Sequence, residues 1–186
     1  MEVKQSVKVA RPPEEVWAFL SDVPAVAECV PGLQLLEERD DGTYRGSFAI
    51  KVGPLSTKLE GEGALARDDA DRSASVEGKG VDKRGGSRAK GVMRYRVEGD
   101  GEGSVIDVSA EFTLSGPLAQ IGRTSIINDV AQTLTSQFAE NLEQRLANTG
   151  QGNAKEPGES PARNQFDAGK ALKSAVWNRV TKTVKR

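Results

Sequence analysis

Between residues 33 and 115 apolar and polar side chains alternate with a period of two, in six consecutive stretches. This alternation is typical of strands that bury one face and expose the other. The stretches are separated by short turns rich in Asp and Gly, such as Asp40-Asp41-Gly42 and Gly99-Asp100-Gly101. Gaps this short join antiparallel neighbours. We therefore expect a meander of strands over about residues 33–39, 43–53, 56–67, 72–81, 88–98 and 104–115.

The segments on either side of the meander complete the expected fold. Val3–Val9 alternates in the same way and predicts a further strand. Two short helices are expected after it, one starting at Pro12-Pro13 and one over residues 23–28. Gly116-Pro117 ends the sheet, and residues 118–147 then place apolar side chains on one face of a long helix. This order predicts an α+β helix-grip fold, a curved antiparallel seven-stranded sheet wrapped around the C-terminal helix. An open α+β sandwich is the alternative.

The net charge of −1 hides an uneven distribution along the chain. Residues 1–148 carry 18 Lys or Arg against 24 Asp or Glu, whereas residues 165–186 carry six basic residues and one acidic residue. Residues 149–164 hold no large apolar side chain, so they cannot bury enough surface to offset the entropy of ordering. We expect a domain over residues 1–148, a flexible, disordered linker over 149–164 and a basic amphipathic helix over 165–186.

The C-terminal segment is predicted to bind a membrane surface. Arranged as a helix, it has an apolar face with aromatic residues and a face rich in Lys and Arg, which suits the headgroup region of an anionic bilayer. A partner's groove and an unstructured tail are the alternatives. Nucleic acid is not expected as a partner, because the domain is acidic and no aromatic platform accompanies the basic residues. The predicted membrane-binding residues are Phe166, Leu172, Lys173, Val176, Trp177, Val180, Lys182 and Val184.

No apolar run is long enough to span a bilayer, and the N-terminus does not resemble a secretory signal. We therefore expect a cytoplasmic protein, peripheral on the inner face of the cell membrane. The chain has no histidine, and Cys29 is its single cysteine. Serine and cysteine nucleophiles usually need an imidazole base, and most catalytic zinc sites use histidine. We predict no catalytic residue, no metal site and no covalent cofactor, so the protein is not expected to be an enzyme. Cys29 is expected to be a small buried hydrophobe.

Glycines recur in mid-strand on the face predicted to point inward, where Gly61, Gly63 and Gly78 share the parity of Leu59 and Leu65. They either leave a cavity for a large apolar ligand, or let the sheet bend and the helix approach closely. The alternation does not decide between these interpretations. The predicted ligand-binding residues are Phe48, Ile50, Leu59, Gly61, Gly63, Leu65, Gly78, Met93, Tyr95, Phe112 and Leu114 from the strands, and Ile127, Val130, Leu134 and Phe138 from the helix.

Several short motifs carry a family resemblance: Val16–Asp22, Cys29–Gly32, Gly53-Pro54-Leu55, Gly61-Glu62-Gly63, Gly116–Arg123, Ile127–Ala131 and Gln137–Leu142. Over residues 1–148 the chain resembles the carbon monoxide dehydrogenase subunit family CoxG, within the helix-grip superfamily of START domains, polyketide cyclases and Bet v 1 allergens. The resemblance implies an accessory protein beside a molybdenum hydroxylase, typically carbon monoxide dehydrogenase, that recruits the enzyme to the cytoplasmic membrane. It also implies that the protein holds no redox cofactor itself.

The pattern and the resemblance together lead to one hypothesis. A soluble dehydrogenase must pass electrons to quinone dissolved in the bilayer, so a tethered domain with an apolar cavity can serve as a lipid carrier between the two. The predicted ligand is a respiratory quinone such as menaquinone, or a similar isoprenoid lipid. The linker would let the domain swing between membrane and enzyme. Two alternatives remain: a recruitment adaptor without a ligand, and a cyclase-type enzyme, for which Tyr95 is the inward candidate.

Overall fold

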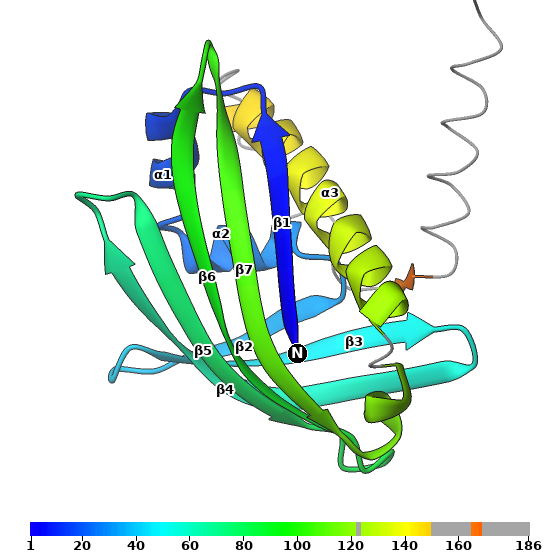
Figure 1. The fold of residues 1–186 in the computed structure, drawn as a ribbon. Helices are drawn as coiled ribbons and strands as arrows, with labels where there is room; N and C mark the ends of the chain where they lie inside the picture. Colours follow the sequence, from blue (N-terminus) through cyan, green and yellow to red (C-terminus); the bar gives the residue numbers. More distant parts are fainter. Residues whose placement is uncertain (122–123, 150–164, 169–186) are drawn as a thin grey trace, which may run out of the picture.

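The structure is a computed structural model that describes residues 1–121, 124–149 and 165–168. Its dominant element is one curved antiparallel sheet in the order β1-β7-β6-β5-β4-β3-β2, as the seven-stranded prediction required (Figure 1). A short eighth strand pairs with β3 in parallel and was not predicted. The strands are β1 (Glu2–Val9), β2 (Leu33–Glu38), β3 (Thr43–Val52), β4 (Leu55–Asp68), β5 (Ser73–Val81), β6 (Arg88–Asp100), β7 (Gly103–Ser115) and β8 (Phe166–Asp167).

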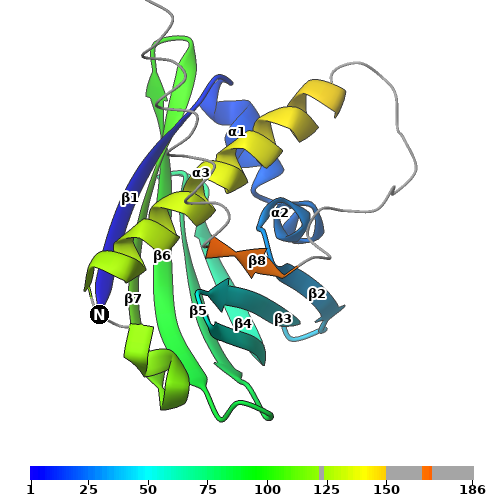
Figure 2. The ribbon, with the colours of Figure 1, turned by 90° about the vertical axis from the view of Figure 1, so that its right-hand side faces the viewer.

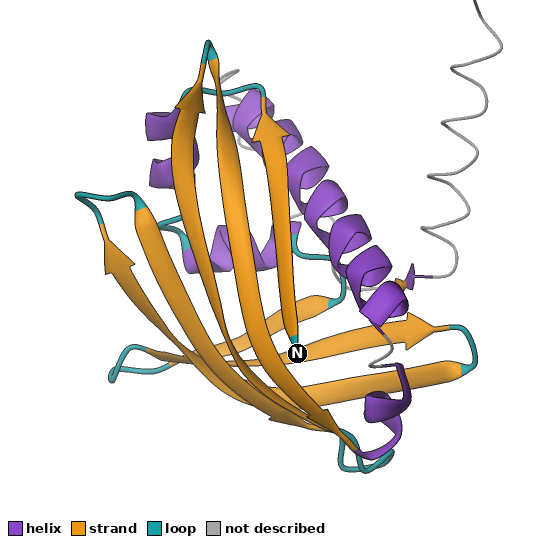
Figure 3. Ribbon diagram, viewed as in Figure 1, coloured by secondary structure: helices purple, strands orange, loops and turns teal. Residues whose placement is uncertain are grey.

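Two short helices, α1 (Pro13–Phe19) and α2 (Val23–Cys29), separate β1 from the meander (Figure 3). The first helix starts at prolines whose fixed φ suits a helix N-terminus. The second is capped by Asp22, whose carboxylate accepts a hydrogen bond of 3.0 Å from the Ala25 N–H. Both helices therefore begin where their sequence signals predicted.

The long C-terminal helix differs from its prediction at its start. Residues 118–121 belong to a 3₁₀ helix, η1 (Gly116–Ile121), and the α-helix α3 runs over Thr124–Thr149. The Leu118 side chain is buried, and its backbone N–H donates to the Ser87 hydroxyl at 3.2 Å. This attachment to the turn between β5 and β6 holds η1 against the sheet. The prediction of one continuous helix from Leu118 is therefore wrong.

Helix α3 crosses the opening of the curved sheet (Figures 1 and 2). Its backbone runs close to β1 and α2, whereas it approaches the central strands β4, β5 and β6 much less. The sheet thus curls around one side of the helix, as in the predicted helix-grip fold. The concave face of the central strands is left to side chains alone.

The buried apolar residues form two separate clusters. The first cluster joins α1, the C-terminal part of α3 and the adjoining ends of the strands, and includes Val16, Trp17, Val97 and Leu142. The second cluster lies between β3, α3 and β8: its buried residues are Ile50, Val130, Phe166 and Ala168, with Phe48, Val52 and Leu134 packed against them. The part of the concave face between and beyond these clusters is where a site can lie.

Candidate functional site: the concave face of the sheet

Strand pairing aligns the inward glycines into two rows. Residues directly opposite one another in antiparallel strands share a face of the sheet. Because the two rows lie two residues apart, they form one strip of backbone without side chains on the concave face. The first row is Gly46, Gly61 and Gly80 in β3, β4 and β5, and the second is Gly63, Gly78 and Gly91 in β4, β5 and β6.

The glycines of the strip have different causes. A Cβ built at Gly61 would lie 1.9 Å from the Lys79 carbonyl oxygen, and one at Gly91 would lie 2.4 Å from the Glu111 carbonyl oxygen. At these positions neighbouring strands come too close for any side chain, which is the bending role considered from the sequence. A Cβ at Gly78, in contrast, would meet only the Glu62 carbonyl oxygen, at 3.6 Å. At Gly78 neither strand curvature nor a helix in close contact excludes a side chain, so the space in front of it is open.

Solvent reaches apolar side chains beside this strip. Met93 is 37% exposed, although it shares its face of β6 with Tyr95 and Val97, which pack into the first cluster. Leu59, Phe112 and Leu114 are half-buried on the same face. Leu59, Met93, Phe112, Leu114 and the two glycine rows are called the apolar strip below. An apolar surface that faces a helix without being filled by it is suited to hold an apolar ligand.

The predicted ligand-binding residues fall into two groups. Those from the strands share the concave face, and Phe48 lies opposite Leu59 as the alternation requires. Seven of the predicted residues are core residues: Phe48, Ile50, Val130 and Leu134 belong to the second cluster, and Leu65, Tyr95 and Phe138 pack against the first. Those that belong to neither cluster are Leu59, Gly61, Gly63, Gly78, Met93, Phe112, Leu114 and Ile127.

A polar cluster that the sequence analysis missed lies on the concave face where it meets α1. The Arg67 guanidinium stacks 4.0 Å from the centroid of the Trp17 ring, and its Nη2 donates to Asp69 Oδ1 at 3.1 Å. Trp17 Nε1 donates to the same oxygen at 2.9 Å. These hydrogen bonds, that from Arg67 first, hold the pKa of the Asp69 carboxyl below its usual value. Nη1 of Arg67 is buried and has no hydrogen-bond partner among the described residues.

Parity alone was enough to find Arg67, because it lies two residues after the inward Leu65 on β4. It also stands in the same row as Ala74 and Tyr95. The Tyr95 ring packs 6.3 Å from that of Trp17, and burial raises the pKa of its hydroxyl. The expectation of few inward ionisable groups overlooked a guanidinium next to the apolar strip.

The turn between β5 and β6 closes the sheet at the opposite end from α1. The Asp82 carboxylate accepts hydrogen bonds from the Gly85 N–H at 2.8 Å and from the Thr57 hydroxyl at 2.6 Å. These two contacts, in that order, hold the pKa of Asp82 below its usual value. Asp82 thus ties the turn to β4, and the Ser87–Leu118 hydrogen bond described above ties it to η1. This end of the concave face is fixed by polar contacts.

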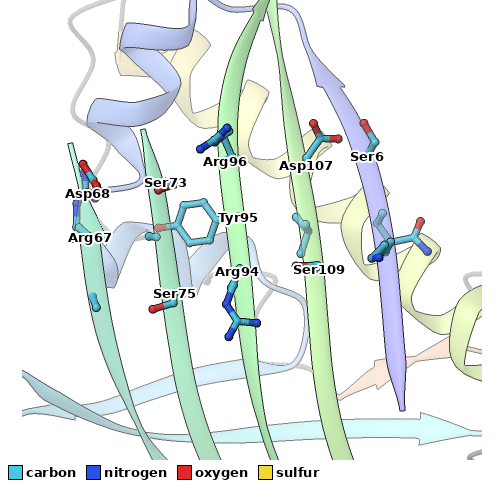
Figure 4. Close-up of a pocket in the computed structure, with 15 residues that line it drawn as sticks. Ser6, Arg67, Asp68, Ser73, Ser75, Arg94, Tyr95, Arg96, Asp107 and Ser109 are labelled. Atoms are coloured by element: carbon cyan, nitrogen blue, oxygen red, sulfur yellow. The ribbon is translucent and has the colours of Figure 1, made fainter. Parts of the chain in front are cut away.

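A hollow of about 860 Å³ lies on the opposite, outward face of the sheet (Figure 4). No residue of α1, α2 or α3 lines it. Its two walls are outward rows of side chains, mostly exposed, from β1, β4, β5, β6 and β7, and of the predicted ligand-binding residues only Tyr95 contributes to it. The wall residues are Lys4, Ser109, Arg94, Ser75 and Ala66 in one row and Ser6, Asp107, Arg96, Ser73 and Asp68 in the other.

The predicted membrane-binding residues lie outside the described residues, with one exception. Leu172, Lys173, Val176, Trp177, Val180, Lys182 and Val184 fall in the undescribed range 169–186, as do residues 150–164 of the predicted linker in theirs. Phe166 is described, and it lies in β8 with only 4% of its surface exposed. The prediction that Phe166 belongs to the membrane-facing side of a helix is therefore wrong for this structure, because strand pairing and core packing claim it.

Three further observations concern the described residues. None of their helices is long and apolar enough to cross a membrane. No three of their His, Cys, Asp or Glu side chains gather as metal ligands do. Cys29 is fully buried, as expected, and burial raises the pKa of its thiol to about 11.

Comparison with known proteins places this site in a family. The model of the carbon monoxide dehydrogenase subunit family CoxG matches residues 6–147, so the chain belongs to that family. No curated protein matches the chain significantly.

Solved structures with the same fold have low sequence identity. A conserved protein of Geobacillus kaustophilus superposes with a TM-score of 0.70 at 18% identity, covering 80% of this chain and 97% of that one. The Zhui aromatase/cyclase of Streptomyces sp. R1128 has a TM-score of 0.56 at 16% identity, covering 84% and 99%. A START superfamily protein of Mycobacterium smegmatis has a TM-score of 0.50 at 14% identity, covering 80% and 98%. These likenesses show the START-like fold.

Proposed function

We propose that this protein is a membrane-recruited carrier that binds a respiratory quinone, such as menaquinone, on the concave face of its sheet and serves carbon monoxide dehydrogenase or a related molybdenum hydroxylase. The observation that carries the proposal is the apolar strip, where an inward methionine is 37% exposed and Gly78 has open space before it. A pure adaptor has no need of such a surface. The name of the family supplies the partner.

The strip suits a long, thin, apolar ligand better than a compact polar one. Each 100 Å² of apolar surface removed from water is worth about 2.5 kcal/mol. An isoprenoid chain can lie along bare backbone and contact Leu59, Met93 and Phe112 at its sides. A flat sheet surface without side chains therefore adds dispersion contacts that a rugged one would lose.

Arg67 offers the ligand a polar end. A buried N–H without a hydrogen-bond partner carries a desolvation penalty of about 1–3 kcal/mol, and more for a charged group. The unpaired Nη1 of Arg67 is such a group, in the sheet row next to that of Met93. A quinone carbonyl oxygen is an acceptor that would satisfy it, and Tyr95 in the same row supplies an aromatic neighbour for the ring. In this proposal both residues bind and orient, and neither performs acid–base chemistry on the ligand.

The proposal assigns the remaining roles as follows. The protein acts as a binding protein rather than an enzyme, and it holds no covalent cofactor. The basic segment after Ala168 would attach it to anionic lipid on the inner face of the cytoplasmic membrane, where quinone is dissolved. Electron transfer would take place on the dehydrogenase, to which the carrier presents its ligand.

The proposal is tested by extraction of quinone from vesicles. The full chain is mixed with phosphatidylcholine–phosphatidylglycerol vesicles containing menaquinone-4, recovered from them at high salt, and analysed for bound quinone. We expect quinone to leave the vesicles with the protein, and Arg67→Leu to retain less of it than the wild type. Recovery of quinone-free protein from vesicles that keep their full content would refute the carrier function and leave the adaptor.

A further inference from the structure

The segment Gln165–Ala168 returns to the domain after α3 and lies across the gap between β3 and α3, beside α2 (Figure 2). Ala168 is fully buried and Phe166 almost so. Both contribute to the second cluster, in which Ile50 comes from the sheet and Val130 from the helix. This segment, called the strap below, therefore connects the two elements that flank the concave face on this side.

The strap has a site shaped to receive it. Strand β2 pairs with β3 only as far as Phe48, so the edge of β3 beyond that point is free of β2. The strap occupies this edge, with Phe166 opposite Ile50 and Asp167 opposite Lys51. Gln165 Nε2 donates to the Ile50 carbonyl oxygen at 3.3 Å. The strap thus takes a strand position that continues the line of β2.

Gly32 makes room for the Phe166 ring at this position. It has a positive φ of 81°, and a Cβ there would lie 3.0 Å from Phe166 Cβ and 2.4 Å from the Ala49 carbonyl oxygen. Its own carbonyl accepts a hydrogen bond of 2.9 Å from the Ala49 N–H. The turn after α2 is therefore built around both β3 and the strap.

The strap is held mainly by burial of one aromatic ring. The strand contains two residues, and the ion pair of Lys51 with Asp167, at 3.8 Å, is partly exposed. Surface ion pairs contribute little, and so short a strand adds few hydrogen bonds. Local elements of this kind open far more readily than the domain unfolds. A small competing force on the chain is enough to release the strap.

We propose that Gln165–Ala168 is a releasable strap that closes the side of the concave face between β3 and α3, and that binding of the following basic segment to the membrane releases it. This proposal rests on the proposed function. Ala168 directly precedes the basic segment of residues 169–186, so no linker separates the docked strap from the proposed membrane anchor. With the strap docked, the domain cannot swing through the length of residues 149–164. The β3–α3 side is instead held close to the bilayer, where opening lets a lipid enter.

A disulfide across β3 and β8 tests the strap. Lys51 and Asp167 are paired in register, and neighbouring strands lie about 4.8 Å apart, within the range that a disulfide bridges. The full chain carrying Lys51→Cys and Asp167→Cys is compared in oxidised and reduced form, with Asp167→Cys alone as the matched control. Cys29 is fully buried and does not compete. Uptake of menaquinone-4 from phosphatidylcholine–phosphatidylglycerol vesicles and sedimentation with the vesicles are measured on each sample.

The oxidised pair should sediment with the vesicles like the wild type but take up quinone about tenfold more slowly, because strap opening gates entry. Reduction should restore the rate, and Phe166→Ala should exceed it. Equal uptake by the oxidised and reduced forms would overturn the strap, as would failure of the two cysteines to oxidise. If no form, wild type included, takes up quinone although the disulfide forms, the proposed function is refuted and the strap's role in ligand entry falls with it.

Discussion

Gly78 is the position at which the apolar strip can be filled with least disturbance of the sheet. Its substitution by leucine places four carbons on the concave face, where the only heavy atom within 4 Å of the new Cβ is the Glu62 carbonyl oxygen at 3.6 Å. Gly61 is a matched control, because it lies in the neighbouring row of the same strip. There the new Cβ would lie 1.9 Å from the Lys79 carbonyl oxygen, and the backbone must move to accept it.

The two variants should differ in stability although the chemical change is the same. Replacing glycine within a strand recovers roughly 0.5–1 kcal/mol, so Gly78→Leu should unfold within about 1 kcal/mol of the wild type. Overpacking at Gly61 should cost about 1–3 kcal/mol or more. For a domain of about 150 residues each kcal/mol shifts Tm by roughly 2–4 °C. We expect Gly61→Leu to melt several degrees below the wild type and Gly78→Leu to melt close to it.

Ligand binding separates the variants in a second way. Gly78→Leu should fold, sediment with anionic vesicles and fail to take up menaquinone-4, because its side chain occupies the strip. Melting temperature and bound quinone are measured on the same preparation of each protein. If Gly78→Leu loses as much stability as Gly61→Leu, the space before Gly78 is closed. If it melts normally and still binds quinone at the wild-type level, the ligand does not lie on the strip.

Three further outcomes are expected. Residues 1–168 alone should remain in the supernatant with anionic vesicles, and salt raised from about 0.05 to 0.5 M should release much of the full chain, because the Debye length shrinks to a few ångströms; salt-independent binding would contradict an electrostatic contribution. The pKa of Asp82 is lowered in the folded protein from 3.8, so its stabilisation is complete above that value and is lost as the pH falls through the lower folded pKa; the Tm gap between the wild type and Asp82→Asn should therefore narrow below about pH 4, and a constant gap would contradict this. With a pKa of about 11 and a fully buried thiol, Cys29 should resist iodoacetamide at pH 8 until the protein unfolds, and rapid native labelling would show that its surroundings open.

Much of the concave face could be predicted from the chain itself. A strand's side chains alternate strictly, so one inward residue identifies the inward face of its strand. Met93 and Gly78 therefore lie on the predicted face. Helix starts at Pro12-Pro13 and before Val23 were equally local, because prolines and a capping aspartate act on the next turn of backbone. Arg67 was available to the same parity argument and was overlooked.

Other features depended on distant parts of the chain meeting. Gly61 and Gly78 have the same local pattern, yet one is required by a close backbone and the other leaves space, since only the curvature of the assembled sheet distinguishes them. Phe166 fits a helical apolar face by its spacing, but a free edge of β3 and the room left by Gly32 place it in a strand. Local pattern determines which face of an element is apolar. Which surface finally covers that face is decided by tertiary packing, because burial depends on what the rest of the chain brings to it.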